Sequence, residues 1–121
     1  MLKLVSGFEH DTVAVVASGI VSGEDYEQLL LPVIESKLHD HASIRFWYEF
    51  SHDFKGITVS ALWDDALLGL FHLSDFSKIA IVVDDKLMAA MAHTLACMVP
   101  CPAKVFGLQE YDIAKQWFDT P

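Results

Sequence analysis

The stretch Ile79-Ala80-Ile81-Val82-Val83-Asp84-Asp85 decides the class of fold. Its first five residues are apolar and rich in β-branched side chains, which is typical of a strand buried on both faces of a sheet. Two aspartates end the strand, and either carboxylate is suited to capping a helix that starts there. Apolar residues then recur at helical spacing from residue 87 to residue 96. A buried strand followed directly by a helix predicts βαβ units and a mostly parallel sheet.

The same alternation of strand and helix precedes this stretch. Residues 43–50 combine Ile, Phe, Trp and Tyr in a two-residue period, which predicts a strand, and the polar residues 51–56 predict a loop. A helix should follow, capped by Thr58 or Ser60, because apolar residues then recur at every third or fourth position as far as Phe71.

The N-terminal part reads as a hairpin followed by a helix. Residues 2–5 and 13–21 are rich in Val, Leu and Ile and are separated by a glycine and a polar stretch, which predicts two antiparallel strands. Ser22 is suited to capping the helix that follows. Pro32 lies within that helical pattern, and its missing N–H predicts a kink or a division of the helix there.

The C-terminal part completes the pattern. Pro100 ends the preceding helix, residues 103–106 predict a short strand, and residues 111–118 predict a last helix. The expected order is therefore ββαβαβαβα in a single α/β domain spanning residues 1–121. It has a mixed, mostly parallel sheet of about five strands, with about four helices on its faces, and only the first strand is antiparallel.

The composition excludes several classes of protein. The chain has 121 residues, of which 53% are hydrophobic and 21% charged, so it is neither disordered nor of low complexity. Its net charge is −9, from 17 acidic and 8 basic residues, which disfavours a nucleic-acid partner. It shows no secretory signal and no apolar run of about 18 residues, so we expect a cytoplasmic protein without a transmembrane segment.

Residues that could perform catalysis or bind a metal form no recognisable motif. There is no Gly-x-Ser-x-Gly turn and no glycine-rich phosphate loop, so we expect neither an enzyme nor a cofactor. His39 and His41 lie two positions apart at the end of a helix and do not share a face, which argues against a metal site. Cys97 and Cys101 lack the spacing of a zinc site, and we expect both to be small core residues.

Two kinds of ligand pocket are conceivable. In open α/β sheets, ligands bind beyond the carboxyl ends of the strands, where Asp84 would meet His52 and Asp53 of the preceding loop. A pocket between a helix and the sheet would instead hold an apolar small molecule or a lipid. Its lining would consist of four large apolar side chains: Phe54, Trp63, Phe71 and Met91.

A surplus of apolar side chains points to a protein contact instead. Leu68, Leu73 and Phe76 do not fall on the main buried stripes, and contiguous exposed apolar residues mark a binding surface. Asp64 and Asp65 lie on the same helix. We therefore expect an interaction patch made of these five residues, occupied by a protein partner or by a second copy in a homodimer.

Several short motifs together resemble a known family of small bacterial proteins. They are Gly19 before the capped helix, Asp25-Tyr26, Pro32, Ile44-Arg45-Phe46, Asp53-Phe54-x-Gly56, Ala61-Leu62-Trp63-x-Asp65, Ile79-Ala80-Ile81-Val82 and Ala114-x-x-Trp117. This pattern resembles the SpoIIAA-like family, which is related to STAS domains (sulfate transporter and anti-sigma-factor antagonist). The resemblance covers nearly the whole chain. It implies an α/β sheet that has been compared with the CRAL-TRIO lipid-binding fold, and a non-enzymatic regulatory or binding role.

The chain departs from the anti-sigma-factor antagonists at their phosphorylation site. Those proteins carry a phosphorylatable serine in an Asp-Ser motif at the start of the helix after the third strand. Here the corresponding residues read Gly56-Ile57-Thr58-Val59-Ser60, and no aspartate precedes either hydroxyl. The usual phosphoserine switch is therefore not expected. Thr58 and Ser60 are the hydroxyls that could be phosphorylated here, but their position favours helix capping as their role.

Overall fold

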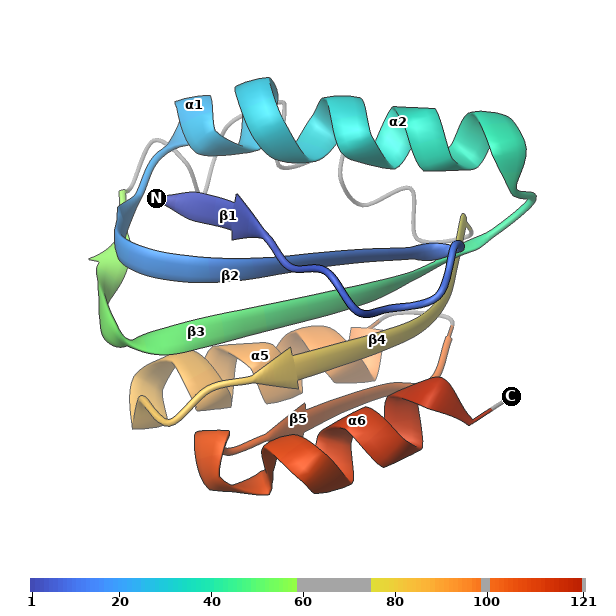
Figure 1. The fold of residues 1–121 in the computed structure, drawn as a ribbon. Coiled ribbons are helices and arrows are strands. Elements are labelled where there is room, and N and C mark those ends of the chain that lie inside the picture. Colours follow the sequence, from blue (N-terminus) through green and yellow to red (C-terminus); the bar gives the residue numbers. More distant parts are fainter. Residues whose placement is uncertain (59–74, 99–100, 121) are drawn as a thin grey trace.

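The computed structural model describes residues 1–58, 75–98 and 101–120, except for the side chains of residues 57, 91, 95 and 98. Its centre is a five-stranded sheet in which the strands lie side by side in chain order (Figure 1). The strands are β1 (Leu2–Leu4), β2 (Thr12–Val21), β3 (Ile44–Ile57), β4 (Phe76–Val82) and β5 (Ala103–Phe106). Among these described strands, only the β1–β2 pair is antiparallel. The mostly parallel α/β sheet predicted from the sequence is confirmed.

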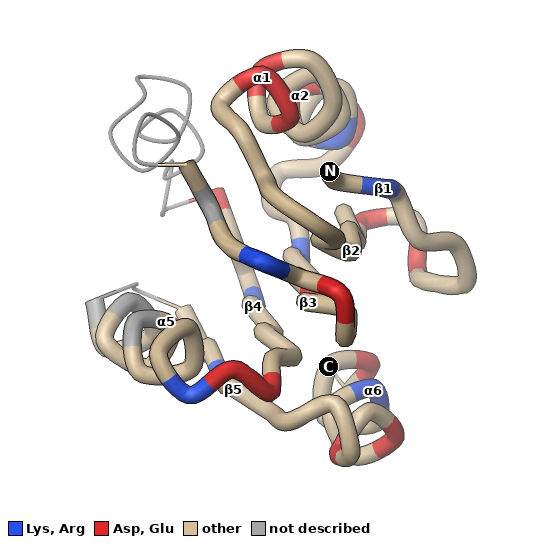
Figure 2. Tube along the Cα trace, turned by 90° about the vertical axis from the view of Figure 1, so that its left-hand side faces the viewer, with Lys and Arg blue, Asp and Glu red and all other residues tan. Residues whose placement is uncertain are grey.

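The helices cover both faces of this sheet (Figure 2). They are α1 (Gly23–Asp25), the π-helical turn η1 (Tyr26–Leu30), α2 (Leu31–Asp40), α5 (Lys86–Met98), the 3-10 turn η3 (Leu108–Glu110) and α6 (Tyr111–Asp119). Right-handed crossovers place the helices that connect neighbouring parallel strands on one face. The last helix, α6, follows the final strand and folds onto the opposite face.

Each face has its own apolar core. On the first face, β-strand residues such as Val15 and Phe46 pack against Tyr26 and Leu30 of η1 and against Ala92 of α5. On the second face, Trp47, Ala80 and Val82 pack against Ala114 and Phe118 of α6. The alternation of side chains along β3 and β4 sends successive residues to opposite cores, so these two central strands are buried on both faces.

Pro32 is accommodated by a change of helical pitch. The N–H of Leu31 donates to the carbonyl of Tyr26, five residues earlier, and this wide turn immediately precedes the proline. Pro32 then falls in the first turn of α2, directly after this wide turn. The division that the sequence predicts at Pro32 is therefore a π-helical turn between α1 and α2.

The predicted loop at residues 51–56 is wrong, because β3 continues to Ile57. The pairing of β2 with β3 shifts from Ala17–Phe50 to Gly19–Phe54, so residues 51–53 bulge out and the ladder then resumes. The prediction failed because the bulge has the polar composition that is usual for a loop. Pairing with β2 on one side holds the strand together beyond it.

Candidate functional site

The two aspartates at the carboxyl end of β4 have structural partners. Asp84 Oδ1 accepts a hydrogen bond of 2.8 Å from the N–H of Leu108, which ties the end of β4 to the turn after β5. Asp85 Oδ1 accepts one of 2.9 Å from the N–H of Met88 in the first turn of α5. Asp85 thus caps a helix, as its position in the sequence predicts. Asp84 links the segment after β4 to the segment after β5 through a hydrogen bond.

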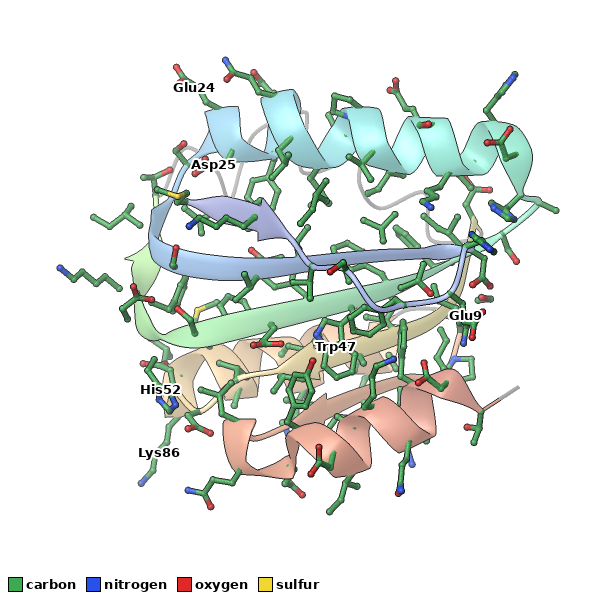
Figure 3. The ribbon with its side chains drawn as sticks, in the orientation of Figure 1. Glu9, Glu24, Asp25, Trp47, His52 and Lys86 are labelled. Atoms are coloured by element: carbon green, nitrogen blue, oxygen red, sulfur yellow. The ribbon has the colours of Figure 1, made fainter. Side chains whose placement is uncertain are left out.

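The other residues expected at this edge lie on the bulge of β3. His52 and Asp53 are exposed, and the Asp53 carboxylate accepts a hydrogen bond from the hydroxyl of Ser51. Figure 3 shows His52 at the same edge of the sheet as Lys86, the first residue of α5. No contact joins His52 or Asp53 to Asp84 in the described part of the chain, so the structure supplies no acid–base pair among these three.

Of the four side chains expected to line the apolar pocket, the structure describes only that of Phe54. Phe54 is half-buried, and its ring lies edge-on to Phe50 with the centroids 4.7 Å apart. Trp63 and Phe71 lie outside the described residues, as does the side chain of Met91.

The expected interaction patch also falls mostly outside the described residues. This applies to four of its members: Asp64, Asp65, Leu68 and Leu73. Phe76 is described, and it is a buried core residue rather than an exposed one: it is 5% exposed and its ring centroid lies 5.7 Å from that of Phe46. The error arises because β4 begins at Phe76 itself, earlier than its apolar run suggests, and the pleat turns this side chain toward the first core.

Two further predictions concern small polar residues. Cys97 is exposed on α5 and Cys101 is half-buried, so the expectation that both are core residues is wrong for Cys97. Thr58 follows β3 directly, and its backbone N–H donates to the carbonyl of Val21, which extends the ladder by one bond. Ser60 lies outside the described residues.

A cavity of about 580 Å³ opens at the opposite, amino end of the parallel strands. It lies between the β1–β2 loop, the start of β3 and β4, and the end of α6. Its lining includes Glu9, Asp11, Arg45, Lys78 and Thr120. The sequence analysis missed this site, although one signal was present: Arg45 and Lys78 occupy positions in buried strands where an apolar residue is usual.

Arg45 connects three parts of the chain. Its Nε donates to both carboxylate oxygens of Asp11 at 3.2 Å, and its Nη2 donates to Asp11 Oδ1 at 2.8 Å. Its Nη1 donates to the carbonyl of Phe118 at 3.0 Å. These hydrogen bonds, together with the positive charge of Arg45, hold the pKa of Asp11 below its usual value.

Lys78 holds the end of α6 from the neighbouring strand. Its Nζ donates to the carbonyls of Trp117 and Thr120 at 2.9 and 2.6 Å, and it lies 4.7 Å from the centre of the Trp117 ring. A cation is favoured here because the last carbonyls of a helix lack partners and carry partial negative charge. Burial lowers the pKa of Lys78, and the nearby charges of Arg45 and Lys104 lower it further.

The side chains that line this cavity are suited to binding a small molecule. Its two hydroxyl groups already donate to main-chain carbonyls, Ser77 to Ile44 and Thr120 to Trp117. Among the residues that the structure describes, no three His, Cys, Asp or Glu side chains converge as metal ligands would. What the cavity offers is charge, arranged around a space large enough for a small molecule.

The family of the chain follows from comparison with known proteins. The sequence model of the SpoIIAA-like family matches residues 12–119. The chain belongs to the SpoIIAA-like family. The resemblance seen in its motifs is thereby confirmed. Membership of this family supports a STAS-type module as the general type of protein.

A solved structure agrees with this assignment. It is described as an uncharacterized protein from the DUF3478 family with a SpoIIAA-like fold, from Shewanella loihica PV-4. It is 27% identical to this SpoIIAA-like chain, with a TM-score of 0.73, and the alignment covers 97% of this chain and 93% of that one. No curated protein matches the chain. Within the described ranges, no helix is both long and apolar enough to span a bilayer.

Proposed function

We propose that this SpoIIAA-like protein is a non-enzymatic regulatory module that acts through a protein–protein contact. The observation that carries the proposal is that Asp84 and Asp85 both accept hydrogen bonds from the backbone. At the edge where open α/β enzymes place their chemistry, both carboxylates are committed to backbone N–H groups of the fold. Family membership supports the same conclusion, since STAS-type modules work through docking.

The proposed contact is the patch of Leu68 and Leu73 with Asp64 and Asp65, and the proposed occupant is a second copy of the chain. The spacing of the two leucines supports this, because they fall outside the helical stripe that faces the core. Phe76 is no longer part of the patch, since its side chain is buried.

Native mass spectrometry of the full chain tests this proposal. We expect a dimer that dissociates in Leu68→Glu, because a charge in an apolar contact must be desolvated without a partner. Leu87→Glu is the matched control: Leu87 is 72% exposed on α5, so the same substitution there should leave the dimer intact. A wild-type monomer, or a dimer unaffected by Leu68→Glu, contradicts the proposed contact.

The same spectra distinguish a carrier from a docking module. An apolar adduct that is present in the native spectrum and lost on denaturation would favour a small-molecule or lipid carrier over the module proposed here. Phe54 is the described residue at that predicted pocket, and its ring already packs against Phe50.

We propose further that regulation proceeds without the phosphoserine switch of the anti-sigma-factor antagonists. No aspartate precedes Thr58 or Ser60, and the N–H of Thr58 is bonded within the sheet. Intact-mass measurement of the protein purified from its native host should therefore show no covalent phosphate. A phosphate mapped to Thr58 or Ser60 by peptide sequencing contradicts this.

A further inference from the structure

The charged groups of the amino-end cavity are sorted by depth. Its two cations are the more buried: the side chain of Arg45 is 14% exposed and Lys78 is 9% exposed. Two of its carboxylates are far more accessible, since Glu9 is exposed and the side chain of Asp119 is 40% exposed. Positive charge therefore lies at the base of the cavity and negative charge at its rim.

The base retains hydrogen-bonding capacity. A guanidinium has five N–H groups, and the described bonds of Arg45 use one on each of Nε, Nη1 and Nη2. One N–H on each of the two Nη atoms is left without a partner in residues 1–58, 75–98 and 101–120. The partners of Lys78 are two carbonyls and a hydroxyl, all uncharged, so among the same residues no carboxylate forms an ion pair with its ammonium. The charge of Asp119 acts on Lys78, but Asp119 is itself paired with Lys115.

The rim retains a free carboxylate. Asp119 is paired with Lys115 at 2.7 Å, and Asp11 is paired with Arg45. The carboxylate of Glu9 makes no hydrogen bond or ion pair with the described residues, and Figure 3 shows Glu9 at the amino end of the parallel strands. After these pairings, the cavity offers one buried positive charge at Lys78 and one exposed negative charge at Glu9.

This arrangement selects a class of ligand. The cavity is lined by two cations and three carboxylates, so a doubly charged phosphate would meet net repulsion. A molecule with one charge of each sign would find a complement for both. The volume, about 580 Å³, lies within the range usual for small-molecule sites.

We propose that this cavity binds a small zwitterion, an amino-acid-like molecule whose carboxylate contacts Arg45 and Lys78 and whose ammonium contacts Glu9. The free Nη N–H groups of Arg45 would donate to the carboxylate, the charge of Lys78 would attract it, and Glu9 would accept from the ammonium. The inference uses residues distinct from those of the proposed protein contact, so either can fail without the other.

The test is titration of the full-length, ¹⁵N-labelled protein, followed through amide chemical shifts. The probes are glycine, β-alanine and γ-aminobutyrate, which separate the two charges by increasing lengths. Acetate and ethylamine carry one charge each and serve as controls. We expect at least one zwitterion to shift amides of residues 9–11, 45 and 78 in a saturable manner, and neither control to do so.

A pair of matched variants tests the role of the rim. Glu9→Gln keeps the size of an exposed side chain and removes its charge, and we expect it to weaken binding about tenfold. Glu24→Gln makes the same change at the opposite end of the molecule (Figure 3) and should leave the affinity unchanged. The proposal is overturned if no zwitterion binds, if acetate binds as well as the zwitterions, or if the two variants behave alike.

Discussion

The ammonium of Lys78 donates to the carbonyl of Trp117, which lies 39 residues further along the chain, at 2.9 Å. A cation from the middle of the sheet thereby completes the last turn of α6, the α-helix described on the second face. The contact explains how a nine-residue helix with no basic residue in its own last turn is held at its C-terminus.

Lys78→Met should therefore destabilise the protein by about 1–3 kcal/mol, because the substitution removes a charged donor from two carbonyls at the end of α6. Urea unfolding followed by tryptophan fluorescence measures the change. Lys104→Met is the control: Lys104 is exposed and lies 5.2 Å from the same indole ring, so its loss should cost less than about 1 kcal/mol. Equal losses for the two variants would mean that Lys78 acts only through the ring.

The ion pair between Asp11 and Arg45 predicts how stability depends on acid. The pKa of Asp11 is lower in the folded state than in the unfolded state, so the unfolded chain binds its proton first as the pH falls. The stabilisation is therefore present at neutral pH and lost below about pH 4. Asp11→Asn should reduce stability at pH 7 and flatten the acid limb of the curve. Glu35→Gln, at an exposed position of α2, should retain the wild-type slope.

The hydroxyls of Tyr26 and Tyr48 form a hydrogen bond of 2.8 Å between η1 and β3. Tyr48→Phe alone leaves the buried Tyr26 hydroxyl without this partner and should cost about 1–2 kcal/mol, whereas the double Phe variant should lie close to wild type. A double-mutant cycle measures this coupling, and additive losses would contradict it.

The same pair predicts a loss of stability in alkali. Burial raises the pKa of both tyrosines, most strongly that of Tyr48, so the unfolded chain releases these protons first. Stability should then fall as the pH rises above about 10. The double Phe variant should show a smaller fall over the same range in urea unfolding, and an unchanged fall would assign the effect to other groups.

At two glycines, the cost of backbone strain can be measured without steric crowding. Gly19 has φ of +56° and Gly56 has φ of +147°, and a methyl group at either would meet no atom within 4 Å. Gly19→Ala should cost about 1 kcal/mol, because other residues enter the left-handed region at modest cost. Gly56→Ala should cost more, about 1–3 kcal/mol, because its region is nearly exclusive to glycine. Urea midpoints test this order, and the reverse order would contradict it.

Local patterns were sufficient for the elements whose signal lies within the element. The run from Ile79 to Val83 indicated a strand buried on both faces, and the acidic residue after it indicated the start of α5. Residues 51–56 were misread because the polar bulge of β3 has the composition of a loop. Phe76 was misread because the start of β4 depends on pairing with Ile44 of β3, which a local pattern does not contain.

The amino-acid sequence by itself determined the class of fold, the order of the elements and the family, because each depends on periodicity and on residues close together in the chain. Only the tertiary structure decided where the charges act. Arg45 and Lys78 come from different strands, Asp11 comes from a loop, and the carbonyls they meet belong to the last helix. Their contacts arise because parallel strands start at the same edge of the sheet and α6 ends there, and no spacing along the chain encodes that convergence.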